Sequence, residues 1–253
     1  MSHARDLETV LARFPKSRPP LPPALQAIYT RQYKENRAGE TPAASASQRL
    51  ERWLHRQVAA DVTSKEAMGP KPTLEIGAGT LNQLNFEPAN PAYDIVEPFE
   101  ELYSDSPLKG RVRSTYADIA DVPAGAAYDR IVSAATLEHI CDLPLVLARA
   151  ARLLTDGGVV RSAIPSEGGF LWKLGWMCTT GLEFRIRHGL DYGLMMAHEH
   201  VNDALEIETL LRALFEDVEI RSFGLGRQLS LYRFLAARKP RLDVAASWEA
   251  RFG

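Results

Sequence analysis

Short apolar runs alternate with helical segments between residues 72 and 165, and this alternation most narrows the folds open to the chain. The runs that read as strands are Pro72–Ile76, Tyr93–Val96, Val112–Tyr116, Tyr128–Ala134 and Val159–Ile164. Strands that alternate with helices usually form a parallel sheet with right-handed crossovers. We therefore predict an α/β fold built on a doubly wound, mainly parallel sheet.

The rest of the chain adds three parts to this sheet. Residues 204–238 read as a helix followed by two strands, Val218–Phe223 and Leu229–Ala237, which we expect to pair antiparallel at one sheet edge. Residues 166–203 have no clean period but are rich in aromatic side chains, which predicts a cap insertion after the fifth strand. Arg161 breaks the apolar pattern of that strand, and the sequence gives no reason for it.

Residues 1–70 are predicted to be an N-terminal helical extension, and residues 71–253 the main domain with its cap. Prolines punctuate the first part, a helix is predicted over Ala24–Asn36, and the small-residue stretch 41–48 reads as a linker before a second helix capped by Ser47. Tyr29, Tyr33 and Asn36 are candidate lid residues.

Charge and composition exclude several classes of protein. A net charge of −2 gives no overall attraction for a polyanion, so we expect no nucleic-acid partner. Two cysteines cannot build a disulfide framework. No apolar run reaches the roughly 18 residues that span a bilayer. We expect a cytoplasmic protein of undetermined oligomeric state.

The stretch TLEIGAGTLNQL, residues 73–84, ends the first predicted strand with two nearly adjacent glycines, Gly77 and Gly79. Ligands of open α/β sheets bind at the carboxyl ends of the strands, where glycine lets them approach the main chain. A dinucleotide fingerprint would need a third glycine at position 82, where Asn82 stands. The loop therefore favours a different nucleotide-like ligand.

Acidic residues follow or end three of these strands and narrow the choice of ligand. Glu75 would repel a pyrophosphate but can hold an ammonium group. Glu97 ends the second strand, where it can accept hydrogen bonds from both hydroxyls of a ribose, and Asp118 follows the third strand, where it can meet an adenine amino group. An amine, a ribose and an adenine without phosphates describe S-adenosylmethionine (SAM).

Taken in order, these residues resemble the class I SAM-dependent methyltransferases. The resemblance rests on EIGAG at 75–79, Glu97, ADI at 117–119, YDRIV at 128–132 and LEH at 137–139, and it is similar to the small-molecule group that includes ubiquinone-biosynthesis (type 11) enzymes. It covers residues 72–165 well and 204–238 in general layout. It implies a Rossmann-like fold and SAM as cofactor.

The resemblance also implies which residues bind the cofactor. They are Glu75, Gly77, Ala78, Gly79, Glu97, Asp118, Ile119, Ser133 and Ala134. The loop from Glu75 would line the methionine end, Glu97 would hold the ribose, and Asp118 with Ile119 would meet the adenine. Ser133 and Ala134 would lie beside the methyl donor. The family often has a further glycine where Leu81 stands, so the turn is expected to differ there.

Three histidines are candidate catalytic residues. His139 follows the fourth strand on the expected substrate side, and a histidine suits proton acceptance from a substrate hydroxyl. The alternative is a histidine that only shapes its loop. His198 and His200 are further base candidates in the wall of the acceptor pocket; they do not fit an H-E-x-x-H metal motif, and we predict no metal.

We therefore predict a SAM-dependent methyltransferase that transfers a methyl group to a small-molecule acceptor, most simply at oxygen. A glycan, a lipid-linked sugar or a secondary metabolite would fit the cap. The aromatic run at 169–177 leaves peripheral contact with a membrane surface open, although most such clusters form the core of a cap. The alternatives are an NAD-dependent oxidoreductase and a non-catalytic SAM-binding regulator or scaffold.

Overall fold

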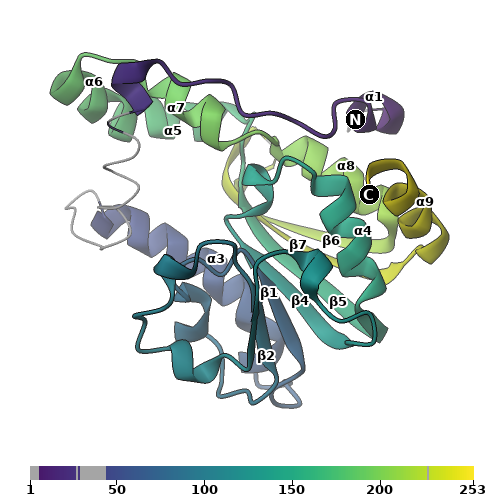
Figure 1. The fold of residues 1–253 in the computed structure, drawn as a ribbon. Coiled ribbons are helices and arrows are strands. Elements are labelled where there is room, and N and C mark those ends of the chain that lie inside the picture. The colour runs from purple at the N-terminus through teal and green to yellow at the C-terminus, as the bar shows by residue number, and fades with distance from the viewer. Residues whose placement is uncertain (1–5, 27, 29–43, 227) are drawn as a thin grey trace.

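A seven-stranded mixed sheet forms the centre of the computed structural model, which describes residues 6–26, 28, 44–226 and 228–253 (Figure 1). Its strand order is β3-β2-β1-β4-β5-β7-β6. Neighbours among β1 to β5 run parallel, and β7 runs antiparallel to both β5 and β6. The strands are β1 (Thr73–Ile76), β2 (Tyr93–Val96), β3 (Ser114–Tyr116), β4 (Tyr128–Ala134), β5 (Leu154–Pro165), β6 (Phe215–Leu225) and β7 (Leu229–Pro240). The predicted fold class, with its antiparallel edge pair, is confirmed.

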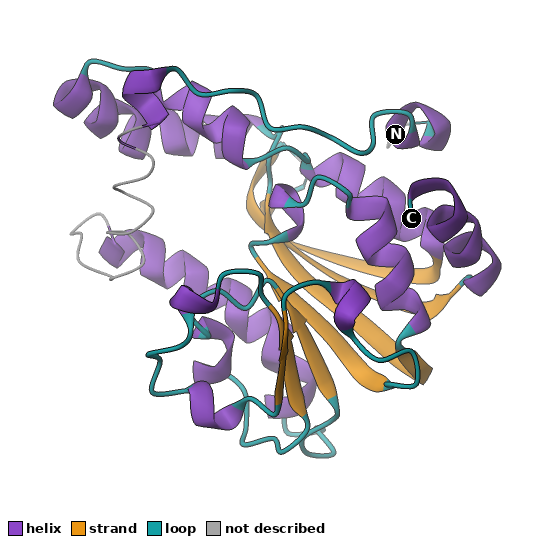
Figure 2. Ribbon diagram, viewed as in Figure 1, coloured by secondary structure: helices purple, strands orange, loops and turns teal. Residues whose placement is uncertain are grey.

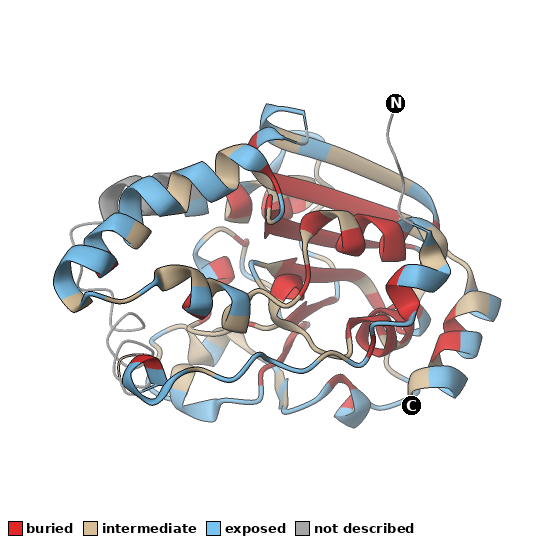
Figure 3. Cartoon of the chain, turned by 90° about the horizontal axis from the view of Figure 1, so that it is seen from above, coloured by how far each residue is buried: buried red, intermediate tan, exposed pale blue. Residues whose placement is uncertain are grey.

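Helices cover both faces of this sheet (Figure 2). Helix α3 (Ala44–Thr63) lies on one face, where its Leu54 and Val58 pack against Val132 of β4 and Phe234 of β7. Helices on the other face pack against the opposite side chains of the same strands; they are α4 (Leu143–Arg152), α8 (Ala204–Leu214) and α9 (Leu242–Phe252). The sequence analysis missed α9. Figure 3 shows the buried residues concentrated along the central strands and inner helices.

Two buried arginines tie α3 to the sheet. Arg161 donates hydrogen bonds to the main-chain oxygens of Val58 and Gln57, and its Nε lies 3.0 Å from a carboxylate oxygen of Asp61. Arg130 of β4 is fully buried and reaches the same Asp61 at 3.0 Å. Arg161, which interrupts the apolar pattern of the fifth strand, therefore holds α3 against the sheet.

The cap insertion is largely helical, which explains why residues 166–203 show no single period. It contains α5 (Phe170–Trp176), the π-helical segment η7 (Met177–Gly181), α6 (Leu182–His188) and α7 (Tyr192–Glu199). These elements form an arm at the left of Figure 1, alongside the chain that follows α1 (Leu7–Leu11). Short helices with separate faces cannot share one hydrophobic period.

Several helices differ from the predicted ones in length or in starting residue. Helix α3 begins at Ala44, inside the stretch predicted as a linker, and the segments between β1, β2 and β3, which were expected to be helical, contain only short 3₁₀ turns. The 3₁₀ segments are η2 (Asn82–Asn85), η3 (Glu100–Leu102), η4 (Lys109–Arg111), η5 (Ile119–Asp121) and η6 (Leu137–His139). The proposed lid residues Tyr29, Tyr33 and Asn36 lie outside the described residues. Across the described ranges, no helix combines the length and apolarity needed to cross a membrane.

Candidate functional site

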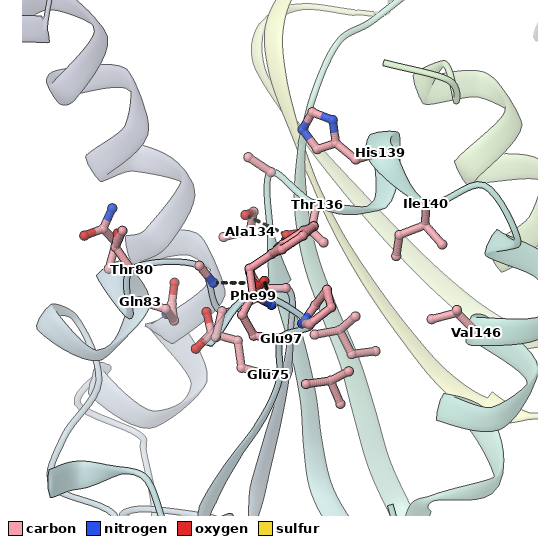
Figure 4. A pocket seen from close by; sticks show the side chains of 18 of the residues that line it. Glu75, Thr80, Gln83, Glu97, Phe99, Ala134, Thr136, His139, Ile140 and Val146 are labelled. Atoms are coloured by element: carbon pink, nitrogen blue, oxygen red, sulfur yellow. Dashed lines mark hydrogen bonds between the residues drawn. The ribbon is translucent and has the colours of Figure 1, made fainter. Parts of the chain in front are cut away.

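A pocket of about 840 Å³ opens at the carboxyl ends of β1, β2 and β4, within the size range typical of small-molecule sites. The strand order reverses between β1 and β4, which is where open α/β sheets bind ligands. Figure 4 shows Glu75 and Glu97 below the pocket, Gln83 on one side, and Thr136 and His139 on the other. Most of the residues predicted to bind the cofactor line it: Glu75, Gly77, Ala78, Gly79, Glu97, Asp118, Ile119 and Ala134.

The glycine loop adopts a backbone that side chains rarely tolerate. Gly77 has φ +72° and Gly79 has φ +50°. A Cβ on Gly77 would lie 2.1 Å from Cγ2 of Thr136, whereas a Cβ on Gly79 would project into open space, so the main chain there is bare toward the pocket. Leu81, where the family often has glycine, keeps a left-handed conformation with φ 66° and is fully buried.

Glu75 is buried beneath this loop, and only 2% of its surface is exposed. Its carboxylate accepts a 2.9 Å hydrogen bond from the hydroxyl of Tyr93. Burial nevertheless raises the pKa of Glu75 to about 8, so the ligand-free carboxyl is mostly protonated at pH 7. A cation brought beside it would favour the charged form.

Glu97 and Asp118 already have hydrogen-bond donors. Glu97 accepts from the main-chain nitrogen of Gly79 at 2.8 Å and from that of Phe99 at 3.1 Å, so one carboxylate braces two loops of the pocket. Asp118 caps η5 by accepting from Ala120 nitrogen at 2.7 Å. Asp118 therefore caps a turn and also lines the pocket.

Two predicted site residues stand back from the pocket lining. Ser133 is 2% exposed and does not line the pocket, and its Oγ has no hydrogen-bond partner in the described structure. His200 is also absent from the pocket wall; its Nδ1 lies 2.8 Å from a carboxylate oxygen of Glu167. Ser133 remains a predicted neighbour of the cofactor, although it does not line the pocket.

His139 and His198 both line the pocket. His139 Nδ1 lies 2.8 Å from the main-chain oxygen of Glu199, and because a carbonyl only accepts, Nδ1 carries a proton; in the neutral ring Nε2 then keeps its lone pair. His198 Nδ1 donates in the same way to the main-chain oxygen of Pro19, at 2.7 Å. The two histidines of the tripeptide, His198 and His200, therefore form hydrogen bonds with different partners.

The sequence analysis missed one wall of the pocket. His55 and Leu54 of α3 line it, together with Gln83, whose Oε1 lies 2.8 Å from His55 Nδ1. Burial lowers the pKa of His55. The sequence predicts the helix that carries Leu54 and His55, but it does not show which side chains of that helix will reach a ligand.

Comparisons with known proteins agree with this architecture. No family profile matches the chain. An uncharacterised methyltransferase of Mycobacterium tuberculosis is 30% identical over 147 residues, which are 56% of this chain and 74% of that protein.

Two solved structures share the fold. A SAM-dependent methyltransferase of Thermotoga maritima, described as a possible histamine N-methyltransferase, matches with a TM-score of 0.53 and 15% identity over 84% of this chain and 97% of its own. An O-methyltransferase family protein of Burkholderia thailandensis matches with a TM-score of 0.52 and 16% identity over 92% and 69%.

The strand order, the pocket at the switch point and the mycobacterial relative lead to one assignment. This chain belongs to the methyltransferase family, in its class I, SAM-dependent branch. The assignment replaces the NAD-dependent oxidoreductase alternative.

Proposed function

We propose that the chain binds SAM in the pocket above β1 and transfers its methyl group to an oxygen atom of a small-molecule acceptor. The observation that carries the proposal is a bare glycine backbone bracketed by two buried acids, Glu75 and Glu97, which suits a cationic ligand with ribose hydroxyls and disfavours phosphates. SAM, when bound, supplies an electrophilic methyl group.

Different residues of the chain would hold different parts of SAM. Glu75 would hold the ammonium group, and Glu97 would accept from ribose hydroxyls with the lone pairs its two main-chain donors leave free. Ile119 and Asp118 would meet the adenine. Ala134 would lie at the methyl-donor end with Ser133 behind it.

The acceptor would enter from the histidine side of the pocket. His139 presents Nε2 as the atom that takes a proton from an acceptor hydroxyl, while the carbonyl of Glu199 fixes its ring. Oxygen is the favoured acceptor atom because a hydroxyl needs such a base more than a thiol does. A glycan, a lipid-linked sugar and a secondary metabolite are the acceptor classes to screen.

The proposal is tested by calorimetric titration with SAM, followed by turnover of labelled SAM with a panel of hydroxyl and amine acceptors. We expect saturable binding and methyl transfer to a hydroxyl compound. Failure to bind SAM would overturn the cofactor assignment. Binding without turnover on every acceptor would favour the regulator or scaffold alternative, and transfer to amines alone would overturn the choice of oxygen.

Binding of SAM at pH 7 should release between about 0.5 and 1 proton per chain. With a pKa of about 8 the free Glu75 carboxyl is mostly protonated, and an ammonium group beside it favours the carboxylate. The release is measured from binding enthalpies in buffers of different ionisation enthalpy. Glu75→Gln should abolish it, so equal release by the variant would contradict a role for Glu75.

Replacing His139 by asparagine should lower the turnover number for an oxygen acceptor by about 10²- to 10⁴-fold, the usual contribution of a general base. Affinity for SAM should change little, because most of the proposed cofactor residues lie at the ends of β1, β2 and β3. Turnover and SAM affinity are measured on the same preparation. Unchanged turnover would leave His139 with only a loop-shaping role.

A further inference from the structure

Three metal-ligating side chains converge beside the pocket, and one of them, His139, also lines its wall. Glu138, His139 and His200 each offer one ligand atom, and these atoms all lie within 4.8 Å of one another. The two imidazole rings are 4.9 Å apart and nearly perpendicular, and His139 Nε2 lies 3.8 Å from Oε1 of Glu138. We propose that these three residues bind a divalent first-row transition metal ion of the Zn²⁺ class.

The two histidines are already oriented as metal ligands usually are. A metal-binding imidazole typically donates its other ring N–H to a carboxylate or a main-chain carbonyl. His139 does so to the carbonyl of Glu199, and His200 to the carboxylate of Glu167, each at 2.8 Å. Neither Nε2 has a hydrogen-bond partner among the described residues, so both are available to an ion.

Glu138 supplies a second, independent reason for a cation. The residue is 1% exposed, and its Oε2 has no hydrogen-bond partner within the described parts of the chain. Burying such an oxygen without a partner is costly, and an ion would satisfy it. The carboxylates of Glu167 and Glu199 add negative charge around the two rings. Arg18 offsets part of it, since its guanidinium lies 3.8 Å from Glu199 and donates to the main-chain oxygen of His139 at 3.2 Å.

The donor set defines the class of ion. Two imidazole nitrogens and one carboxylate suit zinc and its first-row neighbours, whereas Mg²⁺ prefers oxygen ligands. Ligand atoms around a tetrahedral zinc are about 3.3 Å apart, so the side chains would close in by about 1.5 Å at most. Three protein ligands leave a fourth position for water or an acceptor oxygen.

The histidine pair differs from the one that the sequence suggests. His198 and His200 are two residues apart, but His198 donates a hydrogen bond to the main-chain oxygen of Pro19. The ring that lies beside His200 is that of His139, in η6. The ion site itself stands on this geometry. Its role in catalysis rests on the function proposed above. With an ion bound, Nε2 of His139 would be a ligand and would no longer accept the proton; the ion would instead lower the pKa of a coordinated hydroxyl.

The test uses the full chain after treatment with a chelator, without cofactor or acceptor. Titration calorimetry with Zn²⁺ should give one ion per chain, and Mg²⁺ at the same concentration should give no saturable heat. His200→Ala should weaken Zn²⁺ binding at least about 100-fold, and Glu167→Gln, which removes the partner of His200, about 10- to 100-fold. His198→Ala is the matched control from the same tripeptide and should keep the wild-type affinity for Zn²⁺.

Two outcomes would overturn the site: absence of saturable Zn²⁺ binding by the wild-type chain, or equal affinities in the His200→Ala and His198→Ala variants. Thermal unfolding of each variant shows whether a loss of binding reflects a loss of fold. SAM affinity is measured separately, so a chain that binds Zn²⁺ but not SAM would contradict the proposed function and leave the ion site standing.

Discussion

Replacing Gly77 by alanine should destabilise the protein by about 2 to 5 kcal/mol and should sharply weaken SAM binding. The left-handed backbone alone costs a side chain about 1 to 2 kcal/mol. A Cβ would also overlap Thr136, 2.1 Å from Cγ2 and 2.5 Å from Oγ1, and overpacking of this kind costs about 1 to 3 kcal/mol. Denaturant unfolding and calorimetry with SAM measure the two effects.

Gly79→Ala is the matched control, because Gly79 has the same sign of φ but nothing within 4 Å of an added Cβ. It should cost only the backbone term, about 1 to 2 kcal/mol. The double variant Gly77→Ala with Thr136→Gly removes the overlap and should recover stability relative to Gly77→Ala. Equal losses for the two single alanine variants would show that Thr136 does not limit the loop.

Replacing Arg130 by methionine should cost about 3 to 5 kcal/mol, the usual effect of removing one partner of a buried ion pair. Arg130 is fully buried and donates to both carboxylate oxygens of Glu87, at 2.9 and 3.1 Å. Glu87 in turn accepts from Gln83, which contacts His55 in the pocket wall. We therefore expect weaker SAM binding as well, measured by calorimetry beside denaturant unfolding.

The control is Arg221→Met, which breaks a pair with Glu219 on the exposed edge strand and should cost less than about 1 kcal/mol. Adding Glu87→Gln to Arg130→Met removes the stranded charge and should restore part of the stability. An Arg130→Met protein within about 1 kcal/mol of wild type would mean that Glu87 finds another partner, and the buried pair would not be a structural anchor.

Much of the sheet could be predicted because buried parallel strands and their turns are local signals. Tyr93–Val96 and Tyr128–Ala134 were predicted to the residue, and the glycine loop with Glu75 and Glu97 indicated the pocket. These features depend on residues close in sequence. The ligand class followed from the chemistry of those residues.

The missed features all depend on contacts between distant parts of the chain. His55 reaches the pocket only because α3 packs across the sheet, and His139 meets His200 only because α7 returns over the end of β4. The raised pKa of Glu75 follows from its burial, which local sequence does not display. Leu81 has a left-handed backbone with φ 66°, so this turn holds a non-glycine residue in the conformation that favours glycine.

Arg130 and Arg161 also bear on how this chain could be divided or recombined. Arg161 binds Val58, Gln57 and Asp61 of α3, and Arg130 binds Val58 and Asp61 in addition to Glu87, so a fragment starting at residue 71 would lose these contacts. The change of pattern near residue 70 therefore lies between a helix and a sheet that buried ion pairs join. We expect that a relative's helix could replace α3 only if the residues at positions 130 and 161 were replaced together with it.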